Sequence, residues 1–147
     1  MSLEQWLQTG GLLRHEPTVA EIRQLLEVVD RDIRDANATP LSADCRFNLA
    51  YNAGLQLCAI ALHATGFKAA KGGGHHHITI NALDLCLGAS FKDTKIYLSQ
   101  CSRLRSQGIY DRVGVVQERD ASELLSTVTN LWRDVHQWLQ DNHPELC

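Results

Sequence analysis

Paired cysteines, long apolar runs and alternating strand patterns are all missing from this sequence. Its 5 cysteines include no C-x-x-C pair, so the spacing typical of many zinc and redox sites does not occur. Most of them lie within apolar helical patterns, where a thiol serves as a small hydrophobic side chain. The odd number and this placement favour a reducing compartment over a disulfide framework.

Apolar segments are also short. None reaches the ~18 continuous apolar residues that a membrane-spanning helix needs. The opening segment MSLEQWLQTG contains an acidic residue and lacks the apolar run of a signal peptide. We therefore expect a cytoplasmic protein without a membrane segment.

The chain has no excess of positive charge. Its formal net charge is -3 and its isoelectric point is near 6.1, which gives no global reason to expect binding to nucleic acid or to an anionic membrane. Any nucleic-acid site must therefore be local. With 147 residues, 44% of them hydrophobic, the chain is long enough for one domain with a substantial core. Residues 1–147 are expected to form that single domain.

Apolar residues recur at helical spacing along most of the chain, which predicts five main helices. These helices are expected in residues 17–37, 43–66, 77–88, 91–106 and 119–142. Short connections between them favour an all-α fold, an up-and-down helical bundle. Seven residues on the apolar stripes are expected to be buried, namely Phe47, Leu55, Ile60, Leu83, Leu125, Val128 and Trp132.

Capping residues mark the ends of these helices. Thr18 and Glu21 have the spacing of a capping box, and Pro40 requires the first long helix to stop near Asn37. Ser42 is placed to cap the second helix, whose nearly continuous apolar character predicts the most buried position in the bundle. Ser90 resembles a further cap, and Gly88 offers a left-handed stop to the third helix.

The segment KGGGHHHITI contains three consecutive histidines, His75, His76 and His77. Successive side chains on a helix are about 100° apart, so the three imidazoles cannot reach one ion from a regular helix. No cysteine or carboxylate stands nearby to complete a ligand set. We interpret the segment as a glycine loop that leads into the third helix, with His77 near its start, and we expect neither a metal site nor a cofactor there.

Basic residues concentrate in the segment CSRLRSQGIYDR. Arg103, Arg105 and Arg112 surround Gly108 and Tyr110. An arginine can clamp a phosphate through its planar fork, and a phenol can donate a proton beside it. Arg105 and Tyr110 are about 140° apart around an ideal helix, so they converge only if the helix ends or bends near Gly108. A solvated helix face is the alternative interpretation.

The helices and this basic segment together resemble the HEPN superfamily, whose members are small helical bundles that typically form dimers. The resemblance covers nearly the whole chain. Four segments carry it: LLEVVDRDIRDAN, LSADCRFNLAYNAGLQLCAIALHATG, GHHHITINALDLCLG and RLRSQGIYDRVG.

HEPN ribonucleases have an Arg-x(4 to 6)-His motif, commonly with Asn after the Arg, and the resemblance places it at Arg105 to Tyr110. Arg105 matches, whereas Ser106 replaces the Asn and Tyr110 replaces the His. The resemblance implies catalytic roles for Arg105 and Tyr110 and phosphate-binding roles for Arg103 and Arg112. Because a tyrosine with a pKa of about 10 is protonated at neutral pH, Tyr110 suits a proton donor or a phosphate-binding hydroxyl better than a base.

The resemblance also implies acidic support and partners. Asp32 and Asp35 on the first long helix are expected to form solvated or interhelical ion pairs, or to face the Arg105 region. A homodimer is expected, with Trp138 near the edge of its helix as a contact.

Two functions follow from the resemblance. One is a component of a toxin–antitoxin or defence system with a degenerate ribonuclease motif, which binds or cleaves RNA as a metal-independent endoribonuclease alongside a nucleotidyltransferase-like partner. The other is a noncatalytic dimeric module that binds a nucleotide or a partner protein.

Overall fold

The computed structural model describes residues 2–38, 40–110 and 115–147, with backbone alone for residues 107–110. The fold is all-α, as the sequence predicts. Four long helices form its body, and they are α2 (Val19–Ala36), α3 (Ala43–Ala64), α6 (Lys92–Tyr110) and α7 (Glu118–Asn142). Among the described residues, no helix has both the length and the apolar character required to cross a membrane.

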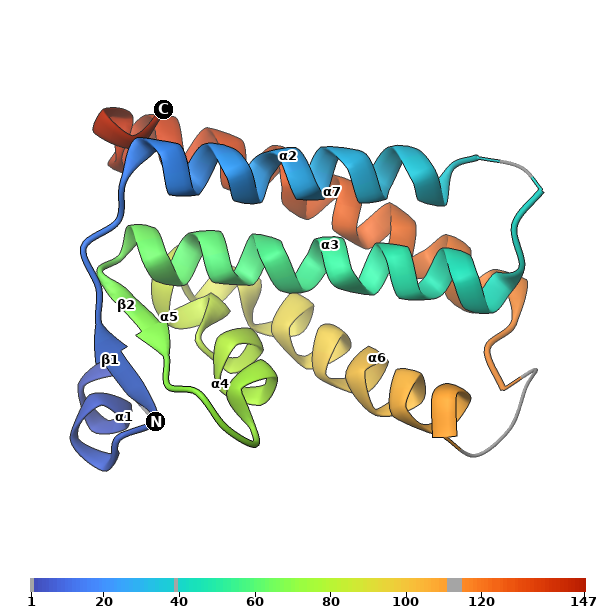
Figure 1. The fold of residues 1–147 in the computed structure, drawn as a ribbon, viewed down its shortest axis with the longest axis horizontal. Helices are drawn as coiled ribbons and strands as arrows, with labels where there is room; N and C mark the ends of the chain where they lie inside the picture. The colour runs from blue at the N-terminus through green and yellow to red at the C-terminus, as the bar shows by residue number, and fades with distance from the viewer. Residues whose placement is uncertain (1, 39, 111–114) are drawn as a thin grey trace.

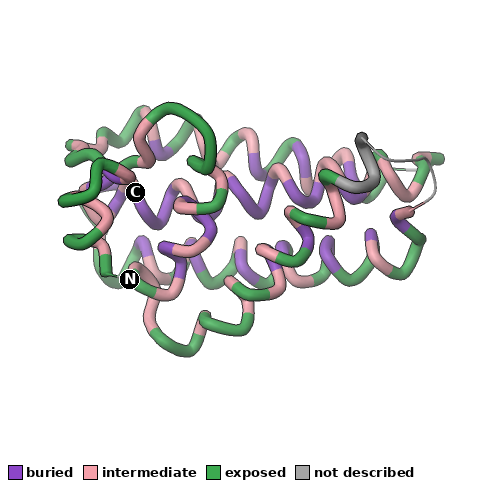
Figure 2. The backbone as a smooth tube through the Cα atoms, turned by 90° about the horizontal axis from the view of Figure 1, so that it is seen from below, coloured by how far each residue is buried: buried purple, intermediate pink, exposed green. Residues whose placement is uncertain are grey.

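Helix α3 lies at the centre of the bundle. Figure 1 shows α2 along one side of α3 and α6 along the other, with α7 behind. Twelve of the 22 residues of α3 are buried, because apolar residues occur all round the helix. In Figure 2 the buried positions line the inner faces of the helices. The prediction that the second helix is the most buried is thus confirmed.

Both predicted caps of the long N-terminal helices form. The Thr18 side chain accepts a hydrogen bond from the Glu21 N–H at 3.1 Å, and the Ser42 side chain accepts one from the Cys45 N–H at 3.1 Å. Only half of the predicted capping box is present, because the Glu21 carboxylate binds His15 instead of the backbone at Thr18. Helix α2 ends at its cap residue Asn37, as expected.

The N-terminal region contains elements that the sequence patterns did not predict. Helix α1 (Leu3–Thr9) is followed by the strand β1 (Leu12–Arg14), which pairs antiparallel with β2 (Phe67–Ala69). Leu12 and Phe67 pack with Leu62 and Ala82 in a small second core. Each strand has three residues, which is too short for an alternating pattern to be recognised.

The predicted third helix is two short helices, α4 (His75–Asn81) and α5 (Leu83–Leu87), which meet at the buried residue Ala82. Gly88 follows α5 with a φ of 116° and a ψ of 164°. Its positive φ is one that glycine tolerates, but the conformation is extended and outside the left-handed helical region, so the predicted left-handed stop is wrong. A short 3-10 helix, η1 (Ala89–Phe91), then leads into α6, so Ser90 is not the cap residue of that helix.

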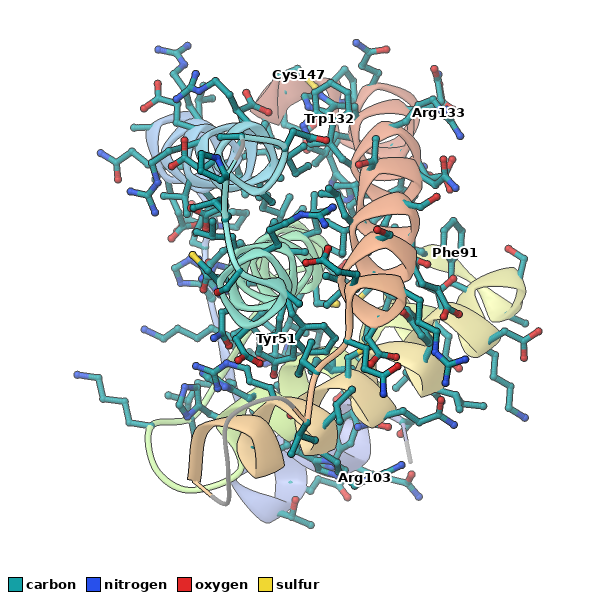
Figure 3. The ribbon with its side chains drawn as sticks, turned by 90° about the vertical axis from the view of Figure 1, so that its right-hand side faces the viewer. Tyr51, Phe91, Arg103, Trp132, Arg133 and Cys147 are labelled. Atoms are coloured by element: carbon teal, nitrogen blue, oxygen red, sulfur yellow. The ribbon has the colours of Figure 1, made fainter. Side chains whose placement is uncertain are left out.

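Trp132 differs from its prediction. Six of the seven predicted core residues are buried, whereas Trp132 is half-buried and Leu131 occupies the core beside it. The indole N–H of Trp132 donates a hydrogen bond to Asp30 Oδ1 at 2.7 Å, joining α7 to α2. Figure 3 shows Trp132 at this boundary. An indole needs a partner for its N–H, and the bundle edge supplies one.

Candidate anion-binding site at Arg105

Arg105 lies on α6 with its guanidinium against the ring of Tyr51 from α3. The guanidinium carbon is 5.1 Å from the ring centroid, within the range of a cation–π contact. Tyr51 is 2% exposed and lies between α3 and α6 in Figure 3. Packing against the ring face orients the guanidinium plane and leaves its edge N–H groups able to donate to an anion.

The hydroxyl of Tyr51 is held by a second residue of α6. It donates a hydrogen bond to the Ser102 hydroxyl oxygen at 3.1 Å. Burial raises the pKa of Tyr51, although the Ser102 hydrogen bond and the Arg105 charge act in the opposite direction. Tyr51 is therefore neutral at physiological pH and serves as a platform for Arg105 rather than as a base.

The pKa of His76, on α4, is lowered by burial and by nearby positive charge. Burial lowers the pKa of His76, and the neighbouring His75 and the Arg105 guanidinium lower it further. A depressed pKa leaves the imidazole neutral at pH 7, in the form that can accept a proton. The charge of Arg105 thus acts on a histidine that is remote from it in sequence.

His76 also lines a cavity of about 280 Å³ between α3, α4 and β2. The polar side chains around this cavity include Gln56, His63, Lys68 and His75. No carboxylate is among the described residues that line it, and no described carboxylate forms an ion pair with Arg105. The local charge is therefore positive, which favours an anionic ligand despite the negative charge of the whole chain.

Arg103 does not join this group. It is exposed on α6 and points away from the bundle in Figure 3. Residues two positions apart in sequence are separated by about 200° around a helix. Arg103 and Arg105 therefore lie on opposite sides of α6. The structure does not bring Arg103 to the site that Arg105 shares with Tyr51.

Two further predicted residues are not placed by the structure. Arg112 lies outside the described residues, and so does the side chain of Tyr110. The backbone of α6 continues through Gly108 and ends at Tyr110, four residues beyond the predicted end at Ser106. The convergence of Tyr110 with Arg105 stays a prediction.

The acidic residues of α2 lie on another side of α3. Asp32 is 2% exposed and accepts hydrogen bonds from Asn52 on α3 and from Arg31 at 3.1 Å. Asn52 follows Tyr51 directly, so adjacent residues of α3 face opposite neighbours, α2 and α6. Asp35 is half-buried on α2. Neither carboxylate is among the described contacts of Arg105.

The three consecutive histidines occupy the first turn of α4, after the left-handed cap residue Gly74. His75 and His76 have ring centroids 4.3 Å apart, and His75 Nδ1 lies 3.0 Å from the Gly72 carbonyl oxygen. His77 diverges from them and contacts the Asn81 side chain. His76 lines the cavity between α3, α4 and β2, whereas His77 faces a different cavity.

That other cavity, of about 450 Å³, also contains basic residues. Lys92 and Lys95 line it together with Trp6 and Asp84. The ammonium of Lys95 lies 3.3 Å from Asp84 Oδ2, so one of the two lysine charges in this cavity is paired. Asp84 therefore offsets part of the positive charge in this cavity.

Tyr51, Ser102 and His76 were missed by the sequence interpretation. Tyr51 and Ser102 lie within apolar helical patterns, where a core role was the natural assignment. Their approach to Arg105 depends on how α3, α4 and α6 pack, which no local spacing encodes. No protein-family model, curated protein or solved structure matches this chain.

Proposed function

We propose that this chain is a HEPN-like protein that binds the phosphate of an RNA or a nucleotide at Arg105. The observation that carries the proposal is the placement of the Arg105 guanidinium over the Tyr51 ring, with the guanidinium carbon 5.1 Å from the ring centroid. The contact with the ring restrains the arginine fork, and no described carboxylate forms an ion pair with it, so its N–H groups can donate to an anion. The resemblance to HEPN proteins supports nucleic acid as the source of that phosphate.

Binding of a labelled mixed-sequence RNA, followed by fluorescence anisotropy, tests this proposal. A hydrogen bond to a charged group contributes about 1.5–3 kcal/mol, so Arg105→Ala should weaken binding roughly 10-fold or more. The matched control is Arg103→Ala, which removes an exposed arginine from the opposite side of α6. Its effect should be small, and raising the salt concentration should weaken binding by the wild type.

Equal losses in the two arginine variants would contradict a site at Arg105 and indicate nonspecific attraction to the surface of α6. If neither RNA nor nucleoside triphosphates bind, the nucleic-acid role is wrong and the chain is better described as a noncatalytic module for a partner protein. Circular dichroism of each variant confirms that the helices are intact.

Cleavage requires more than phosphate binding, because a group must take the proton from a ribose 2′-OH. Burial lowers the pKa of His76, so its neutral imidazole suits that role, whereas Tyr110 suits proton donation to the leaving oxygen. We expect any RNA cleavage in the presence of a chelator to be lost in Arg105→Ala. Parallel assays of His76→Gln and Tyr110→Phe test the proposed proton acceptor and the proposed proton donor separately, and Tyr110→His tests whether an imidazole at the motif position increases the rate.

The proposal extends to the assembly and setting that the resemblance implies. The proposed assembly is a homodimer in the cytoplasm. The proposed setting is a toxin–antitoxin or defence system with a nucleotidyltransferase-like partner. Light scattering over a concentration series measures the dimer directly, and a constant monomeric mass at tens of micromolar, about the range where exposed interfaces associate, would contradict it.

A further inference from the structure

Three potential metal ligands meet on the side of the bundle where β1 leads into α2. His15 Nε2 lies 2.6 Å from Glu21 Oε2 and 2.9 Å from Glu21 Oε1, and His63 Nδ1 lies 3.8 Å from Glu21 Oε1. The two imidazole rings have centroids 5.0 Å apart. One ligand atom from each residue can be chosen so that all three lie within 4.8 Å of one another.

The three residues come from different parts of the chain, and local hydrogen bonds or helix ends fix the backbone at each of them. His15 follows β1, and its backbone N–H donates to the Gly66 carbonyl oxygen at 2.9 Å. Glu21 is in the first turn of α2, whose start is fixed by Thr18, and His63 is in the last turn of α3. All three side chains are partly buried, with exposed fractions of 18%, 28% and 22% respectively. The cluster is therefore a product of the tertiary fold.

His63 Nδ1 has no hydrogen-bond partner among the described residues although it is buried. A buried polar atom without a partner is costly, and 3.8 Å is too long for a hydrogen bond to Glu21. Burial lowers the pKa of His63, and the charges of His15 and Lys68 lower it further, while Glu21 raises it. The neutral imidazole that results is the form that binds metal ions.

We propose that His15, Glu21 and His63 bind one divalent transition-metal ion, with zinc as the best match to the donors. Two imidazoles and a carboxylate form a ligand set that zinc uses in proteins with a water molecule in the fourth position. Zinc bonds of about 2.0–2.2 Å at tetrahedral angles place ligand atoms roughly 3.3 Å apart. The spacing of 2.6–3.8 Å around Glu21 is close to that value, and all three ligand atoms lie within 4.8 Å of one another, so side-chain movements would bring them to tetrahedral spacing.

A bound ion would join the segment that follows β1 to α2 and α3, two helices that already pack closely against each other. It would tie the connection between β1 and α2 to the end of α3, next to the small core that holds the N-terminal helix. Because metal affinity couples to folding, the ion should stabilise this end of the molecule. The inference goes beyond the proposed function, since neither Arg105 nor a nucleic acid takes part in it.

Isothermal titration of the chelator-treated protein with zinc tests the proposal. We expect one equivalent to bind to the wild type and the thermal midpoint to rise with zinc. His15→Gln, Glu21→Gln and His63→Gln should each lose more affinity than the roughly 10-fold to 100-fold loss typical of an outer-shell partner. Glutamine at position 21 keeps the size of the side chain and suits the first turn of a helix.

Two control variants identify adventitious binding. His143→Gln removes a histidine that pairs with Glu145 alone, and a triple glutamine variant of His75, His76 and His77 removes the consecutive run. Both should bind zinc as the wild type does. Absence of stoichiometric binding to the wild type, or full binding by the three ligand variants, would overturn the proposal.

Two measurements on the wild type keep the proposal testable if a ligand variant does not fold. Cobalt in place of zinc should give tetrahedral absorption bands without a thiolate charge-transfer band, because no cysteine is in the ligand set. Ring ¹⁵N shifts of His15 and His63 should change on addition of zinc, and those of His143 should not. Thiolate bands, or unchanged His15 and His63 shifts, would contradict the site.

Discussion

At the scale of single residues, Tyr51 contributes to the proposed anion site through its ring face and to stability through its hydroxyl. The ring supports the Arg105 guanidinium, while the hydroxyl joins α3 to Ser102 of α6. These two contacts can be separated by substitution because they use different parts of the side chain. Neither could be predicted from the sequence, since Tyr51 and Ser102 meet only through the packing of two long helices.

Tyr51→Phe should leave RNA affinity nearly unchanged and lower the free energy of unfolding by about 0.5–1.5 kcal/mol, the net contribution of a typical hydrogen bond. Tyr51→Leu removes the aromatic face as well and should weaken RNA binding. Anisotropy titrations and urea unfolding of both variants measure these effects. A Tyr51→Phe variant that binds RNA as poorly as Tyr51→Leu would show that the hydroxyl, not the ring, matters.

At the scale of elements, the long helices were predictable and the short ones were not. The apolar stripes of α2 and α7 extend over 18 and 25 residues, so their period is unambiguous. The strands β1 and β2 have three residues each, and their pairing depends on chain segments far apart in sequence. In α7 the predicted apolar stripe is largely correct, but the neighbouring residue Leu131, rather than Trp132, occupies the core.

The neighbouring residues Leu131 and Trp132 test this view of α7. Leu131 is 2% exposed in the main core, so Leu131→Ala should lower the free energy of unfolding by about 2–5 kcal/mol. Trp132→Phe keeps an aromatic ring and loses the hydrogen bond to Asp30, at a cost of about 0.5–1.5 kcal/mol. Urea unfolding measures both changes, and a larger loss in Trp132→Phe would contradict the observed packing.

At the scale of the whole molecule, two histidines make stability depend on pH. The pKa values of His63 and His76 are lowered in the folded protein, chiefly by burial. The unfolded chain, with a histidine pKa of about 6.5, therefore binds more protons as the pH falls through that value. The contribution of these two histidines to the free energy of unfolding is fully present above about pH 6.5. It decreases as the pH falls from there toward the folded pKa values. The charged or titratable groups that act on His63 are Glu21, His15 and Lys68. Those that act on His76 are His75 and Arg105.

The urea midpoint measured in chelator should fall between about pH 7.5 and pH 5.5, the window on either side of the unfolded histidine pKa. His63→Gln and His76→Gln should each reduce the size of that fall, because each removes a group that the folded state keeps neutral. His143→Gln serves as the control, since its side chain pairs with Glu145 near the end of the chain. A midpoint that rises on acidification would contradict the argument.

The central claim is that a phosphate binds at Arg105 on the Tyr51 platform. Nuclear magnetic resonance of ¹⁵N-labelled protein, titrated with a short RNA, measures the location of binding directly. We expect the largest shifts at the Arg105 Nε–H and the His76 ring, with little change at the Arg103 Nε–H across the helix. Shifts concentrated instead at Lys92, Lys95 and His77, which line the larger cavity, would contradict the claim.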